Sequence, residues 1–366
     1  MSLSSRCSFR AVLLSSVALL TGGCASSHGA GQAAAPATAS TYERDRVHAV
    51  GLGSLTVEDT VRHRSLKAVL WYPAAPGTRM ESQATSPIFA PFLAAKDAPV
   101  SDARERWPVV LLSHGSGGTA INMSWLGAHL AAHGFLVVSV NHPGNTYGDD
   151  SPEGYARGYE RPRDFSVLLD HLLKDSKWGP RMDPERIGAA GHSMGGYTAL
   201  ALVGARLNLQ WIAEGCTAPE TRDHVGCEGL RDVDYSRIDM KVARASYRDP
   251  RVKSAFAMAP GMAGSYEARD LKDIHAEVGL VLAKGDELMP HELMGMKLAR
   301  QLPAASTRTL VLDDAGHFTF LPECRPLGFE VAPPLCRDAV AGTRAASHEN
   351  TKMQAVEFFR RTLDVR

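Results

Sequence analysis

The chain has 366 residues, of which 44% are hydrophobic and 22% are charged, and its 40 Lys and Arg residues balance its 40 Asp and Glu residues. This composition is that of a globular protein with ample length for a buried core. Balanced charge, with no basic stripe and interleaved aromatic residues, argues against a nucleic-acid partner.

The first 23 residues have the features of a signal peptide. Arg6 and Arg10 form a positive start, and residues 11–20 form an apolar run that is too short for a transmembrane helix. The run ends in LTGGC, which resembles the processing site of bacterial lipoproteins, although Thr21 stands where that motif usually has Leu. We therefore expect export and membrane anchoring through a lipid on Cys24, with plain secretory cleavage as the alternative.

Residues 24–45 are mostly small and polar, so we expect them to form a flexible tether ahead of a folded domain at 46–366. Within that domain lie four cysteines, which allow three pairings. The simplest framework joins the two close couples, Cys216–Cys227 and Cys324–Cys336. An oxidising compartment favours disulfides over the alternative of free buried thiols. Since no CxxC or His/Cys spacing indicates zinc, no metal is expected.

From about residue 47 strand and helix patterns alternate along the chain. Continuous apolar strands between amphipathic helices are typical of a mostly parallel sheet with helices on both faces. The first helix is expected to begin at Asn122 as its N-cap. The expected strands are 47–57, 66–72, 109–112, 135–140, 187–190, 254–258, 280–283 and 309–312, and the expected helices are 122–133, 165–173, 194–204, 289–302 and 349–363.

Residues 205–248 interrupt this alternation with polar and charged residues and with the first cysteine couple. Ligands of mostly parallel sheets bind at the carboxyl ends of the strands. We therefore expect 205–248 to be a small lid-like insertion that covers a site at that edge.

A serine follows the strand at 187–190 directly, in the sequence GHSMGG at 191–196. In this strand–turn–helix context, small residues around Ser193 let the chain turn sharply and lift the hydroxyl above the sheet, as in a nucleophile elbow. The helix that follows offers its dipole and free amides to a developing anion. The sequence therefore predicts Ser193 as a nucleophile, and a purely structural tight turn is the alternative.

A serine nucleophile needs an adjacent base, and in the α/β-hydrolase fold the order along the chain is Ser, acid, His. His317 follows the last expected strand and is the predicted base. His114 and His142 precede Ser193 in the chain, and His192 is adjacent to it, so these three fit the role less well.

The predicted acid is Asp286, on the turn after the strand at 280–283. A carboxylate there reaches the second ring nitrogen of His317, fixes its tautomer and stabilises the imidazolium. Glu287 is the neighbouring alternative, and Asp313 and Asp314 lie close to His317 in sequence.

An oxyanion hole needs two backbone N–H groups. One is predicted at Met194, after the nucleophile, and the other at Ser116, in the loop GSGG at 115–118. The glycines admit the close approach that an anion requires. A phosphate-binding loop is excluded because no Lys-Ser or Lys-Thr follows the glycines.

Several motifs together resemble the platelet-activating-factor acetylhydrolase and bacterial dienelactone-hydrolase-like group of the α/β-hydrolase superfamily. The motifs are LWYP at 70–73, LLSHGSG at 111–117, AHGF at 132–135, GHSMGG at 191–196 and GHFTFL at 316–321. The resemblance covers roughly residues 47–365. Dienelactone hydrolases use a cysteine nucleophile, however, and position 193 is Ser, so a dienelactone substrate is not expected.

The resemblance implies a serine esterase that acts without a metal or organic cofactor, on short acyl esters or phospholipid-type esters. An amidase or peptidase with the same triad is the alternative, since ester and amide cleavage use the same residues. A binding protein on an inactive hydrolase scaffold is a third hypothesis, against which the complete set of triad and oxyanion motifs argues.

Overall fold

The computed structural model describes residues 48–218, 227 and 229–365. The predicted signal peptide, the lipidation site at Cys24 and the predicted tether lie outside the described residues. None of the helices in the described part of the chain has the length and apolar character that crossing a membrane requires.

Ten strands of the described residues form one sheet, in the order β12-β11-β10-β9-β5-β6-β2-β1-β4-β3. From β6 to β12 all neighbouring strands are parallel, whereas β2 runs antiparallel to both β1 and β6. This confirms the predicted mostly parallel sheet. The strands are β1 (Ala49–Asp59), β2 (Arg64–Ala74), β3 (Glu81–Gln83), β4 (Phe92–Lys96), β5 (Trp107–Ser113), β6 (Leu136–Val140), β9 (Met182–His192), β10 (Val252–Met258), β11 (Glu277–Ala283) and β12 (Thr307–Leu312).

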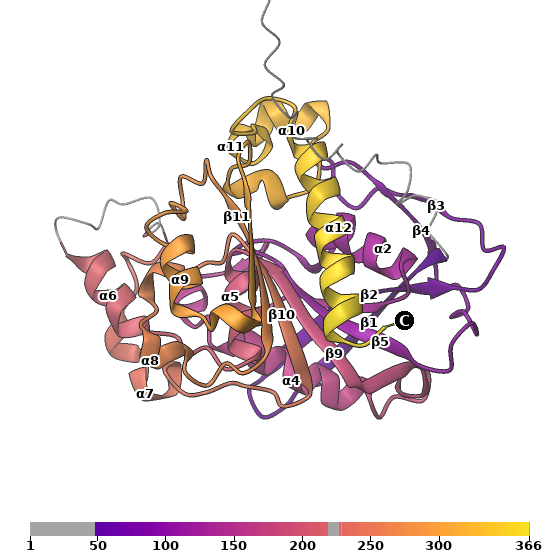
Figure 1. Ribbon diagram of the computed structural model, residues 1–366, viewed down its shortest axis with the longest axis horizontal. Helices are drawn as coiled ribbons and strands as arrows, with labels where there is room; N and C mark the ends of the chain where they lie inside the picture. Colours follow the sequence, from indigo (N-terminus) through magenta and orange to yellow (C-terminus); the bar gives the residue numbers. More distant parts are fainter. Residues whose placement is uncertain (1–47, 219–226, 228, 366) are drawn as a thin grey trace, which may run out of the picture. The chain divides into compact units, whose positions relative to one another are not determined.

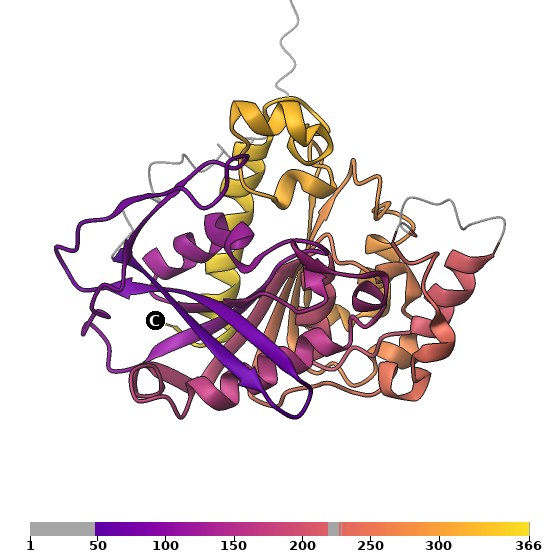
Figure 2. The same ribbon diagram turned by 180° about the vertical axis from the view of Figure 1, so that it is seen from behind.

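Helices cover both faces of this sheet. On one face α2 (Ser124–Ala132) and α12 (Arg344–Thr362) lie against each other and against the strands (Figure 1). On the other face α5 (Met194–Leu202) packs on β5, β9 and β10, with α4 (Glu160–Leu172) beside it (Figure 2). The predicted layers are therefore confirmed.

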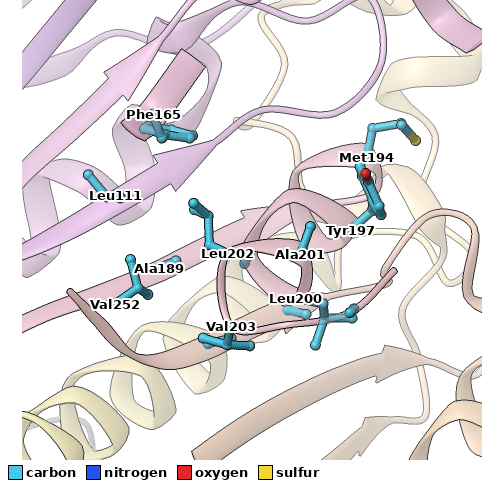
Figure 3. Packing of buried hydrophobic residues seen from close by; sticks show 14 of the residues in the cluster. Leu111, Phe165, Ala189, Met194, Tyr197, Leu200, Ala201, Leu202, Val203 and Val252 are labelled. Atoms are coloured by element: carbon cyan, nitrogen blue, oxygen red, sulfur yellow. The ribbon is translucent and has the colours of Figure 1, made fainter. Parts of the chain in front are cut away.

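Side chains of the central strands alternate between two cores, because successive residues of a strand point to opposite faces. In β5, Val109 and Leu111 belong to the core under α4 and α5, whereas Val110 and Leu112 belong to the core under α2 and α12. Figure 3 shows α5 residues such as Leu202 packed near Leu111 and Val252. Burial on both faces explains the continuous apolar runs in the sequence.

Shorter elements complete the fold, and two disulfides tie them. Cys216–Cys227 bridges α6 to the residues that follow it, and Cys324–Cys336 bridges the segment that carries α10 and α11, so the predicted pairing is confirmed. These elements are β7 (Asn145–Thr146), β8 (Asp149–Asp150), α3 (Pro152–Ala156), α6 (Leu209–Thr217), α7 (Met240–Ala243), α8 (Ala268–Leu271), α9 (Gly295–Gln301), α10 (Pro326–Val331) and α11 (Pro333–Cys336).

Four predicted helix starts are wrong. The helices expected from 165 and from 349 each begin five residues earlier, α4 at Glu160 and α12 at Arg344. Asn122 is not the N-cap of α2, because its side-chain oxygen accepts a hydrogen bond from the Thr119 amide at 2.7 Å and it lies in a 3₁₀ turn at Ala120–Met123. The helix expected over 289–302 begins only at Gly295. The expected range contains Pro290, which disfavours helical backbone at the residue before it. Residues 291–294 form a turn, and the Met294 amide donates to the Pro290 carbonyl at 2.9 Å.

Candidate active site

Ser193 lies on the sharp turn between β9 and α5, with φ 53° and ψ −120°. A non-glycine residue with positive φ is strained, and such strain clusters at functional sites. The turn is possible because the residues two positions before and after Ser193 are glycines. A Cβ on Gly195 would lie 2.0 Å from the Ser113 carbonyl oxygen, and a Cβ on Gly191 would lie 2.3 Å from the Gly195 backbone. The backbone at Ser193 therefore has the conformation of the nucleophile elbow that the sequence predicts.

The structure brings Ser193, His317 and Asp286 together from three separate loops. The Ser193 Oγ lies 2.9 Å from His317 Nε2, and His317 Nδ1 lies 2.8 Å from Asp286 Oδ2. His317 and Asp286 are buried, at 6% and 5% exposure, whereas Ser193 is half-buried. With the proton on Nδ1, the imidazole donates to the carboxylate and its Nε2 is free to accept the serine proton.

The Asp286 carboxylate is held by its own loop. Its Oδ1 accepts hydrogen bonds from the Leu288 amide at 3.0 Å and the Met289 amide at 2.6 Å, which leaves Oδ2 for His317. The alternative acids are placed differently. Glu287 is exposed, and Asp313 is exposed and pairs with Lys284 on the surface at 3.0 Å.

The two predicted oxyanion donors flank the nucleophile. Met194 opens α5, where the first amides have no acceptor within the helix. The loop that carries Ser116 passes directly beside Ser193, since a Cβ on Gly115 would lie 3.3 Å from the Ser193 Cβ. The Gly261 amide donates to the Ser193 carbonyl at 2.7 Å and so braces the elbow from a third side.

Behind this site lies a second Ser–His–Asp hydrogen-bond chain, which sequence reasoning missed. The Ser113 Oγ lies 3.0 Å from His142 Nε2, and His142 Nδ1 lies 2.9 Å from Asp164 Oδ2. All three side chains are at most 1% exposed, so no substrate reaches Ser113. Burial and the positive charge of Arg161 hold the pKa of His142 well below its ordinary value. This chain is therefore structural.

Arginines surround the buried Asp164. Arg64 binds both carboxylate oxygens at 2.8 Å, and Arg62 lies 3.0 Å from one of them. Arg161, 1% exposed, donates to the Ser113 hydroxyl at 3.1 Å and to the His114 carbonyl. Asp164 and Arg161 carry no recognisable motif. The helix expected over 165–173 omits the first turn of α4, and Arg161 and Asp164 lie in that turn.

Burial of neutral histidines makes stability depend on pH. Desolvation, the first cause in each case, holds the pKa values of His114, His142 and His192 well below 6.5, and lowers that of His348 to about 3. In the unfolded chain each histidine gains a proton near pH 6.5. The unfolded state then binds more protons, so the free energy of unfolding falls as the pH is lowered below 6.5.

We expect denaturant unfolding to show a loss on the order of 1 kcal/mol per pH unit for each such histidine between pH 6.5 and pH 5. His348→Gln is the matched variant, since its amide nitrogen can still donate to the Thr319 carbonyl, which His348 Nε2 contacts at 2.8 Å. Its stability should fall less steeply than that of the wild type. An unfolding free energy that is flat over this range would contradict the assignment of neutral histidines.

Comparisons with known proteins match the part of the chain that holds the elbow. Residues 99–224, which include Ser116 and Ser193, match the PETase family, described as PET hydrolase-like. The chain is 34% identical to Cutinase 2 of Thermobifida cellulosilytica over 103 residues. These residues make up 28% of this chain and 36% of that protein. The chain is 35% identical over 91 residues to Lipase 1 of Moraxella sp. (strain TA144), 25% of this chain and 26% of the lipase. The chain thus spans about a third or less of the length of these relatives.

A solved structure matches nearly the whole fold. The ferulic acid esterase from Streptomyces cinnamoneus aligns with a TM-score of 0.57 and 22% sequence identity, over 91% of this chain and 93% of that chain. Together with the parallel sheet, the helices on both faces and the strand order, this establishes the predicted α/β-hydrolase fold. Within the described ranges, no group of three or more His, Cys, Asp or Glu side chains is arranged to hold a metal ion.

Proposed function

We propose that the protein is an exported serine hydrolase that cleaves carboxylic esters through an acyl-enzyme formed on Ser193. The observation that carries this proposal is the continuous hydrogen-bond chain from Ser193 through His317 to Asp286, with the hydroxyl placed at the N-terminus of α5. The similarity to cutinases and to a lipase supports carboxylic esters as the substrate class.

In the proposed mechanism, His317 Nε2 takes the Ser193 proton as the serine Oγ attacks the ester carbonyl. Asp286 stabilises the imidazolium that forms, and the amides of Ser116 and Met194 bind the oxyanion. His317 then gives its proton to the leaving alcohol. A water molecule, deprotonated by the same histidine, attacks the acyl-enzyme and releases the acid.

The finer substrate proposal is a short acyl or phospholipid-type ester, as the resemblance to acetylhydrolases implies. We also propose that the described part of the predicted lid, 205–218, 227 and 229–248, borders the substrate. A Cβ on Gly229 of this segment would lie 3.5 Å from the Tyr155 ring, and a Cβ on Gly117 would lie 3.0 Å from the Tyr155 hydroxyl oxygen. Tyr155 thus connects the proposed lid with the loop of the oxyanion donor.

We further propose that the protein works outside the cytoplasm, anchored through Cys24. The two disulfides support an oxidising compartment. We expect the protein in the membrane fraction to have the intact mass of a chain that begins at an acylated Cys24. A mature protein with an unmodified N-terminus in the soluble fraction would contradict anchoring and would support simple secretion.

The substrate proposal is tested by comparing kcat/KM for p-nitrophenyl esters and for p-nitroanilides with the same acyl groups, from acetyl to octanoyl. We expect turnover of the esters, fastest with the shorter acyl groups, and far slower turnover of the anilides. Anilide cleavage at an equal or higher kcat/KM would establish an amidase instead. A lack of turnover of both series, with detergent present, would favour the inactive scaffold.

A further inference from the structure

The Gly115–Ser116 peptide is held in one orientation by two hydrogen bonds. The Gly115 carbonyl oxygen lies 2.6 Å from His114 Nδ1 and accepts from the Gly118 amide at 3.2 Å. A trans peptide is planar, so its N–H points opposite to its C=O. The Ser116 N–H therefore points away from the buried His114 ring.

The protonation of His114 follows from its two ring contacts. The His142 amide donates to His114 Nε2 at 3.4 Å, so this nitrogen carries a lone pair and the ring proton lies on Nδ1. Nδ1 then donates to the Gly115 carbonyl. The ring is fully buried, and burial together with the charge of Arg161 lowers its pKa well below the ordinary value, so it stays neutral.

Arg161 ties the same loop to the helix of the other oxyanion donor. Its guanidinium donates to the His114 carbonyl, and its Nε donates to the Thr198 hydroxyl at 3.2 Å. The Thr198 hydroxyl donates in turn to the Met194 carbonyl at 2.8 Å. One buried cation thus bridges the loop of Ser116 and the first turn of α5.

We propose that His114 is a positioning residue, which fixes the Gly115–Ser116 peptide so that the Ser116 N–H faces the reacting carbonyl, with Arg161 holding the adjoining peptide. This inference rests on the proposed esterase function. It explains why a buried polar ring lies behind the loop. Without the Nδ1 donor, the peptide loses the hydrogen bond that opposes its rotation, and the oxyanion loses part of its binding.

The test is the kinetics of His114→Leu with a p-nitrophenyl ester, with enzyme concentration set by active-site titration. We expect kcat to fall about 10- to 100-fold, while KM changes little. This fall is no larger than the fall in kcat that follows removal of one oxyanion donor. The inhibition constant of a boronic acid, whose serine adduct places an oxygen in the oxyanion hole, should rise by the same factor.

Three further variants separate positioning from general damage. His114→Asn should recover much of kcat, because its amide nitrogen can take the place of Nδ1, whereas His114→Gln should not. His133→Leu is the matched control, since this buried histidine contacts the His129 carbonyl at 2.8 Å in a region away from the site, and its kcat should stay unchanged.

An unchanged kcat in His114→Leu would overturn the inference, as would Asn and Gln variants of equal activity. If the Leu variant does not fold, the Asn and Gln pair decides the question. Ser193→Ala measured beside them tests the proposed function separately. Hydrolysis that survives that substitution removes the esterase mechanism itself, whereas its loss together with normal His114→Leu kinetics removes only the role of His114.

Discussion

Replacement of Ser193 by alanine is expected to lower kcat for a short p-nitrophenyl ester by about 10⁵- to 10⁶-fold, because the proposed acyl-enzyme cannot form. The fold should survive. Alanine at φ 53° has the same backbone strain as serine, and the hydrogen bond lost to His317 contributes only about 1 kcal/mol. Initial rates, together with thermal unfolding of both proteins, measure the two effects.

A second serine in the same molecule, Ser113, can be compared with Ser193. Ser113 has the same type of hydrogen-bond partners as Ser193, a histidine and then an aspartate, but is only 1% exposed. Ester hydrolysis that persists in Ser193→Ala at more than about a hundredth of the wild-type kcat would contradict the assignment. Ser113 could not account for such hydrolysis, because the fold encloses it.

The second large effect is expected for Asp286→Asn, with a fall in kcat of about 10⁴-fold. The Leu288 and Met289 amides will keep the side-chain oxygen on their side, so the new NH₂ group faces His317. Nδ1 must then accept a hydrogen bond, which moves the ring proton to Nε2. In that tautomer the imidazole cannot accept the proton of Ser193.

Glu287→Gln and Asp314→Asn are the matched controls, because both remove a carboxylate near the same loops, and both residues are exposed. Each should retain kcat within about twofold, in line with the small effects of most surface substitutions. If either control fell as far as Asp286→Asn, or if Asp286→Asn kept more than a tenth of kcat, Asp286 would not be the orienting acid.

Local patterns were enough to predict the elements around the elbow. The strand before Ser193 and the helix after it appear in the structure as β9 and α5, and the loop at 115–118 lies beside the serine. These features depend on residues close in sequence, small at the turn and apolar on both sides. Because β9, β11 and β12 run parallel, they end at the same edge of the sheet, where the loops after β11 and β12 bring Asp286 and His317 to Ser193.

Such local patterns do not predict polar contacts between segments that are far apart in the sequence. The chain from Ser113 through His142 to Asp164 joins three segments, and each residue by itself resembles an ordinary loop or helix residue. The late start of α9 has a local cause, because the expected range contains Pro290, which disfavours helical backbone at the residue before it, and residues 291–294 form a turn. The hydrogen-bond chain of Ser113 depends on contacts between segments far apart in the sequence, which no local pattern contains.

The most direct test of the central claim is fluorophosphonate labelling of the purified protein, followed by peptide mass spectrometry that resolves Ser193 from Ser113. The proposed mechanism predicts a single phosphonylated serine at 193 and loss of labelling in His317→Ala. A label on another serine, or equal labelling of Ser193 without His317, would contradict the claim that His317 activates Ser193.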